Sequence, residues 1–287
     1  MKVCGFSFVR NAIKYGFPVV ESIQSILPLC DHFAISVGHS DDDTLELIKS
    51  INSNKLQIVD SVWDESKRSG GEVLALETNK TFDVIGSNFD WCFYIQADEV
   101  VPEKYHTIIR QAMEKYKDNP EIDGLLFKYL HFWGNYSYIG DSRRWYRREI
   151  RIIKNNKNIR SYRDAQGFRK NNQKLNVKLI DAYIYHYGYV KSPALMYQKL
   201  NDFQKYKRGD HYQEKNDEGT YNYADIESVA VFNGVHPLVM ENRIKKLNWD
   251  IDLNAKKQKS SLKNRILHFI EKKTGYRLFE YKNYKII

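Results

Sequence analysis

An acidic segment directly after an apolar run is the most informative feature of this sequence. Residues 91–95 are all apolar or aromatic, and residues 96–99 read Gln-Ala-Asp-Glu. Acids at the tip of a strand buried on both faces lose hydration free energy unless a cation or hydrogen-bond donors compensate them. Mg²⁺ and Mn²⁺ prefer oxygen ligands and bridge carboxylates to substrate phosphates. The segment therefore predicts a divalent-cation site, and the alternative is a turn that caps the helix expected after Pro102.

A second acidic cluster follows another apolar run. Three aspartates occupy positions 41–43, between the run 33–37 and the helical pattern 44–51. Such acids cap a helix and interact favourably with its dipole. One of them can instead accept hydrogen bonds from a base or a ribose. The two interpretations are compatible, with different aspartates in each role.

Five arginines form the densest basic stretch of the chain. They are Arg143, Arg144, Arg147, Arg148 and Arg151. Alternation along a strand would place some of them on each face, and one interpretation is solvated charge. The other is a clamp on a diphosphate or on an anionic acceptor, because guanidinium forks match phosphate oxygens.

Alternating strand and helix patterns must position these side chains. Short apolar runs predict strands, and periodic apolar residues predict helices between them. The strands are expected at 3–9, 33–37, 56–59 and 91–95, and the helices at 44–51, at 72–85 and after Pro102. This order is typical of βαβ units around a mainly parallel sheet, which binds ligands beyond the carboxyl ends of its strands. The predicted fold class is therefore α/β, with a Rossmann-like central sheet flanked by helices.

The regular alternation stops near residue 124. Residues 124–129 and 149–153 predict further strands, now without a helix between them. From Pro193 the sequence becomes helical and Lys-rich, and the segment 262–279 has the pattern of an amphipathic helix. Packing against the rest of the protein is one interpretation of that helix. Peripheral attachment to an anionic membrane is the other.

Composition narrows the classes of partner. The chain of 287 residues has a formal net charge of +9, which favours nucleic acid, anionic lipid or nucleotide phosphates. Its 21 tyrosines suit surfaces that stack on rings and hydrogen-bond to polar groups. Cys4, Cys30 and Cys92 lack metal-site or disulfide spacing and are expected to be reduced core residues of a cytosolic protein. The sequence has neither a signal-peptide pattern nor an apolar run long enough to predict a membrane span.

Three segments occur in the order seen in glycosyltransferase family 2, the inverting GT-A class. They are Phe-Ser-Phe-Val-Arg-Asn at 6–11, Ser-Asp-Asp-Asp-Thr at 40–44 and Gln-Ala-Asp-Glu at 96–99. The first two thirds of the chain resemble the bacterial branch that makes lipopolysaccharide core and other surface glycans. The strand-end motif of this family is Asp-x-Asp, often with a further acid. Asp98 matches its second Asp and Gln96 replaces the first, and both are expected to contact the donor.

The resemblance implies a binding site for a nucleotide-sugar donor. It implies that Asp42 contacts the nucleobase or ribose, and that Phe8 and Arg10 line the nucleotide pocket. Lys67 and Arg68 match a basic pair that faces the donor, and solvated loop charge is the alternative for them.

The resemblance also implies a metal cofactor, Mg²⁺ or Mn²⁺. Asp98 is its main expected ligand, with Glu99 and His186 as further ligands. A hydrogen-bonded core residue is the alternative for His186, which lies in an aromatic run.

A general base is needed beside the acceptor hydroxyl in an inverting transfer, and a carboxylate is the usual group. Asp164 lies where the acceptor-side acid of the family is expected. Asp141 and Glu149 are rivals for the same role.

The predicted function is therefore that of an inverting, metal-assisted glycosyltransferase of the hexosyltransferase kind. Its expected partners are a nucleotide-diphosphate sugar donor and a glycan or lipid-linked saccharide acceptor. The GT-A catalytic domain is expected at 1–192, with a nucleotide-sugar-binding half at 1–123 and an acceptor-side half at 124–192; a helical region follows at 193–287. The expected location is cytoplasmic, with peripheral contact at the inner face of the membrane left open.

Two other functions compete with this one. A nucleotidyltransferase would use a similar sheet and metal, but it needs a Gly-rich basic loop after the first strand, where only Gly5 and Gly16 stand. A non-enzymatic nucleic-acid binder would explain the charge and the tyrosines. It would not explain acids at strand tips, which repel phosphates without a metal, so no nucleic-acid partner is predicted.

Overall fold

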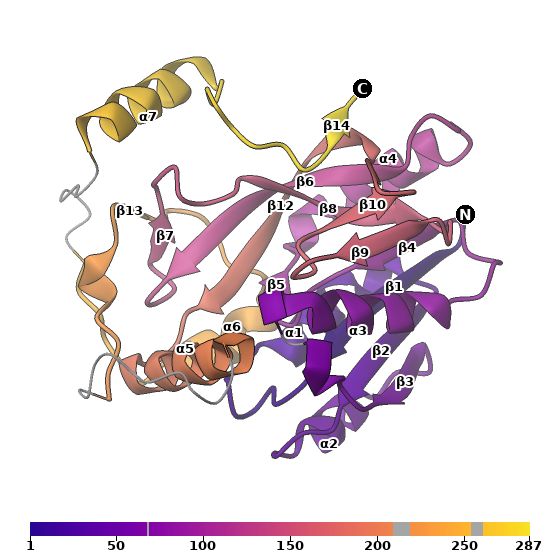
Figure 1. Cartoon of the computed structure of the whole chain (residues 1–287), viewed down its shortest axis with the longest axis horizontal. Helices are drawn as coiled ribbons and strands as arrows, with labels where there is room; N and C mark the ends of the chain where they lie inside the picture. The colour runs from indigo at the N-terminus through magenta and orange to yellow at the C-terminus, as the bar shows by residue number, and fades with distance from the viewer. Residues whose placement is uncertain (68, 209–218, 254–260) are drawn as a thin grey trace.

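The computed structural model of the protein describes residues 1–67, 69–208, 219–253 and 261–287 (Figure 1). Its strands are β1 (Val3–Val9), β2 (His32–Gly38), β3 (Leu56–Ser61), β4 (Trp91–Tyr94), β5 (Glu99–Val100), β6 (Gly124–Trp133), β7 (Tyr138–Gly140), β8 (Arg148–Lys154), β9 (Ile159–Tyr162), β10 (Gly167–Lys170), β11 (Gln173–Lys174), β12 (Asn176–Tyr189), β13 (Val229–Val231) and β14 (Lys285–Ile286). Its α-helices are α1 (Val19–Ile26), α2 (Thr44–Lys49), α3 (Glu72–Asp83), α4 (His106–Tyr116), α5 (Pro193–Arg208), α6 (Glu241–Lys245) and α7 (Leu262–Thr274). Short 3₁₀ helices are η1 (Leu27–Leu29), η2 (Glu65–Lys67), η3 (Ser69–Gly71), η4 (Glu103–Tyr105), η5 (Tyr223–Asp225) and η6 (Leu238–Met240).

One large sheet organises the molecule, with the order β13-β7-β6-β8-β4-β1-β2-β3. The neighbours β4, β1, β2 and β3 are parallel, as the βαβ pattern predicts. Strand β8 enters antiparallel between β4 and β6, where the alternation of strands and helices has ended in the sequence. Strand β12 pairs in parallel with β6 and antiparallel with β5. The predicted α/β fold, with a central sheet flanked by helices, is confirmed.

Both faces of the parallel strands are covered, because successive side chains of a strand point to opposite faces. On one face, Phe33 and Phe93 pack in a core with α1, α2 and α4. On the other face, Phe6 and Tyr94 pack in a core with α3 and the small sheet β11-β10-β9. The three cysteines are buried and form no disulfide, as expected for core residues.

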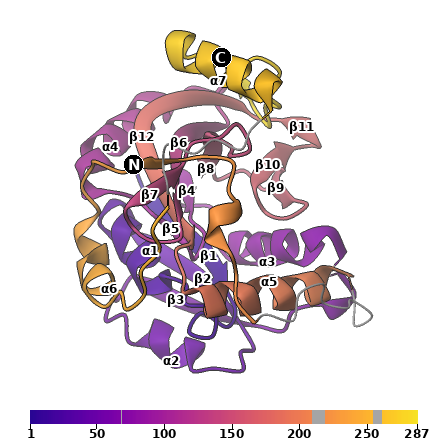
Figure 2. The same cartoon turned by 90° about the vertical axis from the view of Figure 1, so that its left-hand side faces the viewer.

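The C-terminal region joins the sheet at two places. Strand β13 pairs with β7, and β14 pairs with β12. Helix α5 contacts η3, which leads into α3 (Figure 2). The region predicted to be helical therefore also lines the pocket near the ends of the parallel strands. The predicted amphipathic helix at 262–279 is α7, which ends at Thr274. In the described part of the chain, no helix combines the length and the apolar character needed to cross a membrane.

Candidate active site

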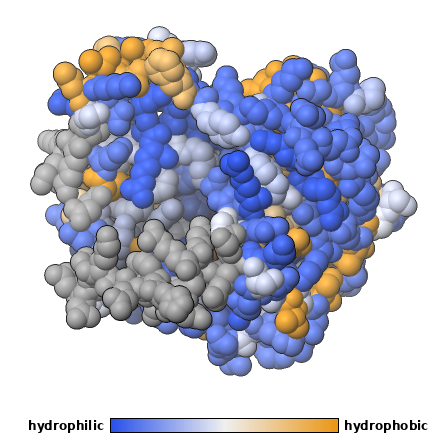
Figure 3. Space-filling model, in the orientation of Figure 1, coloured by the Kyte–Doolittle hydropathy of each residue, from blue (hydrophilic) through white to orange (hydrophobic). Residues whose placement is uncertain are grey.

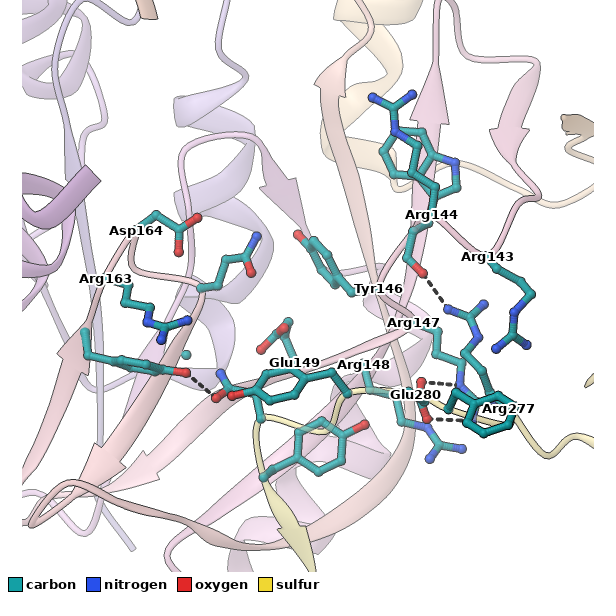
Figure 4. A pocket seen from close by; sticks show the side chains of 18 of the residues that line it. Arg143, Arg144, Tyr146, Arg147, Arg148, Glu149, Arg163, Asp164, Arg277 and Glu280 are labelled. Carbon is teal, nitrogen blue, oxygen red and sulfur yellow. Dashed lines mark hydrogen bonds and ion pairs between the residues drawn. The ribbon is translucent and has the colours of Figure 1, made fainter. Parts of the chain in front are cut away.

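Two adjoining pockets lie near the carboxyl ends of the parallel strands. The inner pocket, of about 490 Å³, is lined by Arg10 after β1, by residues 96–98 after β4 and by Lys199 on α5. The outer pocket, of about 1010 Å³, is lined by arginines of the 143–148 segment and by the C-terminal segment 277–284 (Figure 4). Five residues line both pockets: Arg144, Trp145, Tyr146, Asp164 and Gln166. The two cavities therefore share a wall.

Asp98 lies in the inner pocket, in the loop between β4 and β5. Its backbone carbonyl accepts a hydrogen bond from the Tyr187 amide at 2.8 Å, which ties this loop to β12. Burial by itself raises the pKa of the Asp98 carboxyl, but His186 and then Lys199 outweigh burial. The pKa of Asp98 is therefore lowered, and the residue presents a carboxylate to the pocket.

His186 meets this carboxylate, with its Nε2 atom 3.5 Å from Asp98 Oδ2. Its other ring nitrogen, Nδ1, lies 3.1 Å from Nδ1 of His131. The Nε2 atom of His131 lies 2.7 Å from the carbonyl oxygen of Tyr146, which can only accept, so this nitrogen must donate. Burial lowers the pKa of His131 well below its ordinary value, so His131 is neutral and its Nδ1 accepts from His186. His186 Nε2 therefore faces Asp98 with a proton if His186 is charged, or with a lone pair if it is neutral.

Glu99 does not line either pocket, because a buried ion pair engages its carboxylate. Arg151 donates to both of its oxygens, at 2.8 Å from Nε and 2.7 Å from Nη2. The hydroxyl of Tyr129 donates to the same carboxylate at 2.9 Å. Both members of the pair are fully buried. Glu99 thus anchors Arg151 in this structure, and its predicted role as a metal ligand stays a prediction.

Asp164 stands in a strained turn between β9 and β10. Its neighbours Arg163 and Ala165 have φ values of 56° and 61°, in the left-handed region that side chains other than glycine rarely adopt. Two contacts hold the turn: Gln96 Nε2 donates to the Ala165 carbonyl at 3.3 Å, and Arg151 Nη1 donates to the Gln166 carbonyl at 3.0 Å. Strain of this kind persists where the surroundings determine the conformation, and it concentrates at functional sites. Gln96 and Arg151 therefore fix Asp164 at the wall between the pockets.

An aromatic surface forms the end of the inner pocket near β1 and β2. Phe8, Arg10 and Trp63 all line the cavity. The rings of Phe8 and Trp63 are 5.9 Å apart, and the Arg10 guanidinium lies 5.6 Å from the Trp63 ring. A Cβ atom at Gly38 would lie 2.5 Å from Trp63 Nε1, so glycine at the end of β2 leaves room for the indole. The surface offers flat apolar faces beside a cation.

Asp42 lies outside both pockets. Its carboxylate accepts from the backbone amides of Lys14, at 2.6 Å, and Thr44, at 3.0 Å. The side chain therefore ties the loop after β1 to the start of α2, as the capping interpretation describes. Lys67 is exposed in η2 and also lines neither pocket. Arg68 lies outside the described residues.

The two rival bases lie in different surroundings. Asp141 pairs with Lys272 at 2.7 Å and with His268 at 3.6 Å on α7, and it lines neither the inner nor the outer pocket. Glu149 lines the outer pocket only. Burial raises the pKa of Glu149 to about 8, so this group is largely protonated at neutral pH.

Asp98 and His186 are the residues that could hold a divalent cation. Among the described residues, no group of three or more His, Cys, Asp or Glu side chains is arranged to bind a metal. A Cβ atom at Gly188 would lie 2.5 Å from Asp98 Oδ2 and 2.7 Å from His186 Nε2, so glycine keeps the space beside both atoms open. Mg²⁺ and Mn²⁺ often take one or two protein ligands and complete their shell with phosphates and water. The pair therefore fits such an ion as a partial set of ligands.

Several residues of the site were not predicted from the sequence. Trp63 follows β3 by two positions, and an aromatic residue just after a strand end was an available signal. His131 could have been found from its place on the apolar strand β6. Lys199 had no such signal, because the Lys-rich helix α5 offers several lysines and only the fold places this one in the pocket.

The comparisons with known proteins concern the fold. No family model matches the chain, and no curated protein matches it. Among solved structures it is similar to S. aureus TarS, with a TM-score of 0.42 and 14% identity over 75% of this chain and 41% of that one. A shorter TarS chain in complex with UDP gives a TM-score of 0.40 and 13% identity, over 75% and 68% of the two chains. Glucosyl-3-phosphoglycerate synthase from Mycobacterium tuberculosis, in complex with Mn²⁺, UDP and phosphoglyceric acid, gives a TM-score of 0.30 and 18% identity, over 45% and 43%.

The chain thus spans about two fifths of the full TarS chain. This likeness does not by itself assign the chain to a family. At these scores it carries no information about the substrate or the reaction of this protein.

Proposed function

We propose that this protein is an inverting glycosyltransferase, which moves a sugar from a nucleotide-diphosphate donor to an acceptor hydroxyl. The position of Asp164 carries the proposal. Of the acids that line the two pockets within the described residues, Asp164 alone lines both. A base that takes a proton from one substrate while that substrate attacks the other must stand between the two binding sites.

The inner pocket suits the donor in size and chemistry. Its volume of about 490 Å³ lies within the usual range for small-molecule sites. The rings of Phe8 and Trp63 offer faces on which a base can stack, and Lys199 supplies positive charge for a diphosphate. Arg10, which pairs with Glu65 at 2.7 Å, lies beside these rings.

Asp98 and His186 are the proposed ligands of Mg²⁺ or Mn²⁺ at this pocket. The cation, when bound, would neutralise charge that develops on the diphosphate leaving group. His131 is a positioning residue in this scheme, because its hydrogen bond with Nδ1 of His186 sets which ring nitrogen faces Asp98.

Because the two pockets share a wall at Asp164, an acceptor in the outer pocket can react with a donor in the inner pocket. Asp164 accepts the proton of the acceptor hydroxyl, the hydroxyl oxygen bonds to the anomeric carbon, and the bond from that carbon to the diphosphate breaks. The electron pair leaves with the nucleoside diphosphate. Attack from the outer pocket, on the side away from a diphosphate in the inner pocket, inverts the configuration of the sugar.

A lipid-linked acceptor would place the protein at a membrane surface, and α7 supports that location. Leu262, Ile266 and Phe269 are exposed on this helix among lysines and arginines. Figure 3 shows the apolar patch that they help to form over α7. Such a helix binds anionic lipid through apolar insertion and charge together.

The donor site can be tested by thermal unfolding with a panel of nucleoside diphosphates and nucleotide-sugars, with and without Mn²⁺. A ligand present at 100 times its Kd should stabilise the protein by about 2.7 kcal/mol. Asp98→Asn should lose the part of this stabilisation that depends on Mn²⁺. Absence of any nucleotide effect would contradict the proposal. Release of pyrophosphate from a nucleoside triphosphate and a sugar phosphate would instead identify a nucleotidyltransferase.

The proposed base can be tested with Asp164→Asn. Loss of a general base typically lowers turnover by about 10²–10⁴-fold, while stabilisation by the nucleotide should persist. Asp141→Asn is the matched control, because Asp141 lies outside both pockets, and it should retain turnover. Equal turnover in the two variants would remove Asp164 from the role of base.

A further inference from the structure

The outer pocket carries more positive charge than the ion pairs of its arginines neutralise. Three of its arginines are committed to acids: Arg143 to Glu271, Arg147 to Glu280 and Arg277 to Glu271. These pairs hold the C-terminal segment and α7 against the segment before β8. These ion pairs therefore neutralise three of the six arginines that line this pocket.

The other three arginines have no such partner. Within the described part of the chain, Arg144, Arg148 and Arg163 make no ion pair with an acid. Arg144 and Arg163 are exposed, so their guanidinium groups are open to a ligand. Arg148 is half-buried beside Tyr284 and Glu280, with which it interacts. Figure 4 shows Arg163 on the opposite side of the pocket from Arg148 and Glu280. Charges on two sides of one cavity favour an anion between them.

The acids of the pocket do not cancel this charge, because its six arginines outnumber its four acids, Glu72, Glu149, Asp164 and Glu280. Glu280 is held by Arg147 at 2.7 Å. Glu149 is buried in the wall, and burial raises its pKa to about 8, so near neutral pH it offers a hydroxyl rather than a negative charge. Asp164, the proposed base, is flanked in sequence by Arg163. The positive charge thus surrounds the place where the acceptor hydroxyl would react.

We propose that the outer pocket binds an acceptor that carries a phosphate or carboxylate group, which Arg148 and Arg163 hold while Asp164 meets its hydroxyl. The inference rests on the proposed transfer and adds the chemical class of the acceptor. Arg148 and Arg163 line the outer pocket and not the inner one, so they would not serve the diphosphate of the donor. The forked guanidinium group binds either oxyanion through paired hydrogen bonds.

The aromatic residues of the pocket fit the rest of such an acceptor. Tyr162, Tyr281 and Tyr284 line the same cavity, and tyrosine rings pack on sugar rings while their hydroxyls hydrogen-bond. The volume of about 1010 Å³ is at the upper end of small-molecule sites, so it accommodates a phosphorylated or acidic saccharide.

The test compares three probes of similar size: glucose, glucose 6-phosphate and glucuronate. Each is titrated calorimetrically into the full chain, with and without a saturating nucleoside diphosphate from the donor panel. We expect at least one of the two anions to bind about tenfold more tightly than glucose, in both conditions. The ratio between glucose 6-phosphate and glucuronate shows which oxyanion the pocket prefers.

Variants assign the effect to the pocket. Arg148→Gln with Arg163→Gln should remove the preference for the anion and leave the stabilisation by the nucleoside diphosphate unchanged. Arg160→Gln is the control, because Arg160 pairs with Asp83 and lines neither pocket. Equal binding of glucose and both anions, or unchanged anion binding in the double variant, would overturn the inference. Failure of the proposed function would show separately, as a lack of any nucleotide effect.

Discussion

The inner and outer pockets are built in different ways although they share a wall. The inner pocket takes Phe8 and Arg10 from the end of β1 and Gln96 and Asp98 from the end of β4, so the parallel strands supply its floor. The outer pocket depends on the segment before β8, on the β9–β10 turn and on the C-terminal segment 277–284. A common sheet can thus fix the donor site, while separate loops and the end of the chain shape the acceptor site.

The buried pair of Glu99 and Arg151 connects the two regions. Glu99 follows Asp98 directly, and Arg151 donates to the carbonyl of Gln166 beside the Asp164 turn. The pair therefore fixes the position of Asp98, the proposed ligand of the cation, relative to Asp164, the proposed base. The predictions below test how far the two pockets can be altered independently, from the largest expected effect to the smallest.

Replacing Arg151 with Met should damage both pockets together. The change leaves the carboxylate of Glu99 buried without its partner, which typically costs about 3–5 kcal/mol of the free energy of unfolding. Chemical denaturation measures this loss. The double variant Arg151→Met with Glu99→Leu should recover much of the stability but not the turnover, because the Gln166 carbonyl loses its donor. Full turnover in the double variant would show that the pair does not position Asp164.

Replacing Trp63 with Ala should affect the inner pocket alone. Loss of a stacking surface for a base costs about 1–3 kcal/mol, so the affinity for the nucleoside diphosphate should fall by about 5-fold to 100-fold. Trp63→Phe retains an aromatic face and should lose less. Isothermal titration with the nucleotide and with glucose 6-phosphate separates the two pockets. A parallel loss of both ligands would contradict the assignment of Trp63 to the donor.

Glu149 offers a test confined to the outer pocket. Its pKa is about 8 in the folded protein against an ordinary 4.5, so between these values the folded state binds the extra proton. The free energy of unfolding should therefore fall as pH rises from about 5 to about 8, by no more than about 1.4 kcal/mol per pH unit from this group. Glu149→Gln cannot lose that proton, so its stability relative to the native protein should increase with pH. Parallel pH profiles would show that Glu149 is not the buried neutral acid described here.

Much of the fold was predictable because its signals are local. Side chains of the runs at 3–9, 33–37 and 91–95 point alternately to two buried faces. The bounds of the strands β1, β2 and β4 agree with these predicted ranges to within one residue. The small sheet and the strands of the C-terminal region were not predicted. They are short, and their stability comes from pairing with distant segments rather than from their own pattern, as in β14 with β12.

The candidate site was predictable only in part, and Glu99 shows why. Asp98 and Glu99 are both acids at the end of the same apolar run, yet the turn that closes at Glu99 places Asp98 in the inner pocket and Glu99 against Arg151, 52 residues away. Similarly, the carboxylate of Asp42 accepts hydrogen bonds from the backbone amides of Lys14 and Thr44. Its predicted contact with the nucleotide stays a prediction, because the structure holds no ligand to test it.

The sequence by itself determined that an apolar strand ends in acids, because strand pattern and charge are properties of consecutive residues. It also showed a stretch rich in arginines, but not which of these arginines form ion pairs with acids. Only the tertiary structure decided that Asp164 lines both pockets, that His131 orients His186, and that Arg148 and Arg163 lack acidic partners in the described chain. These facts depend on contacts between segments far apart in the sequence, and such contacts are set by the packing of the whole sheet.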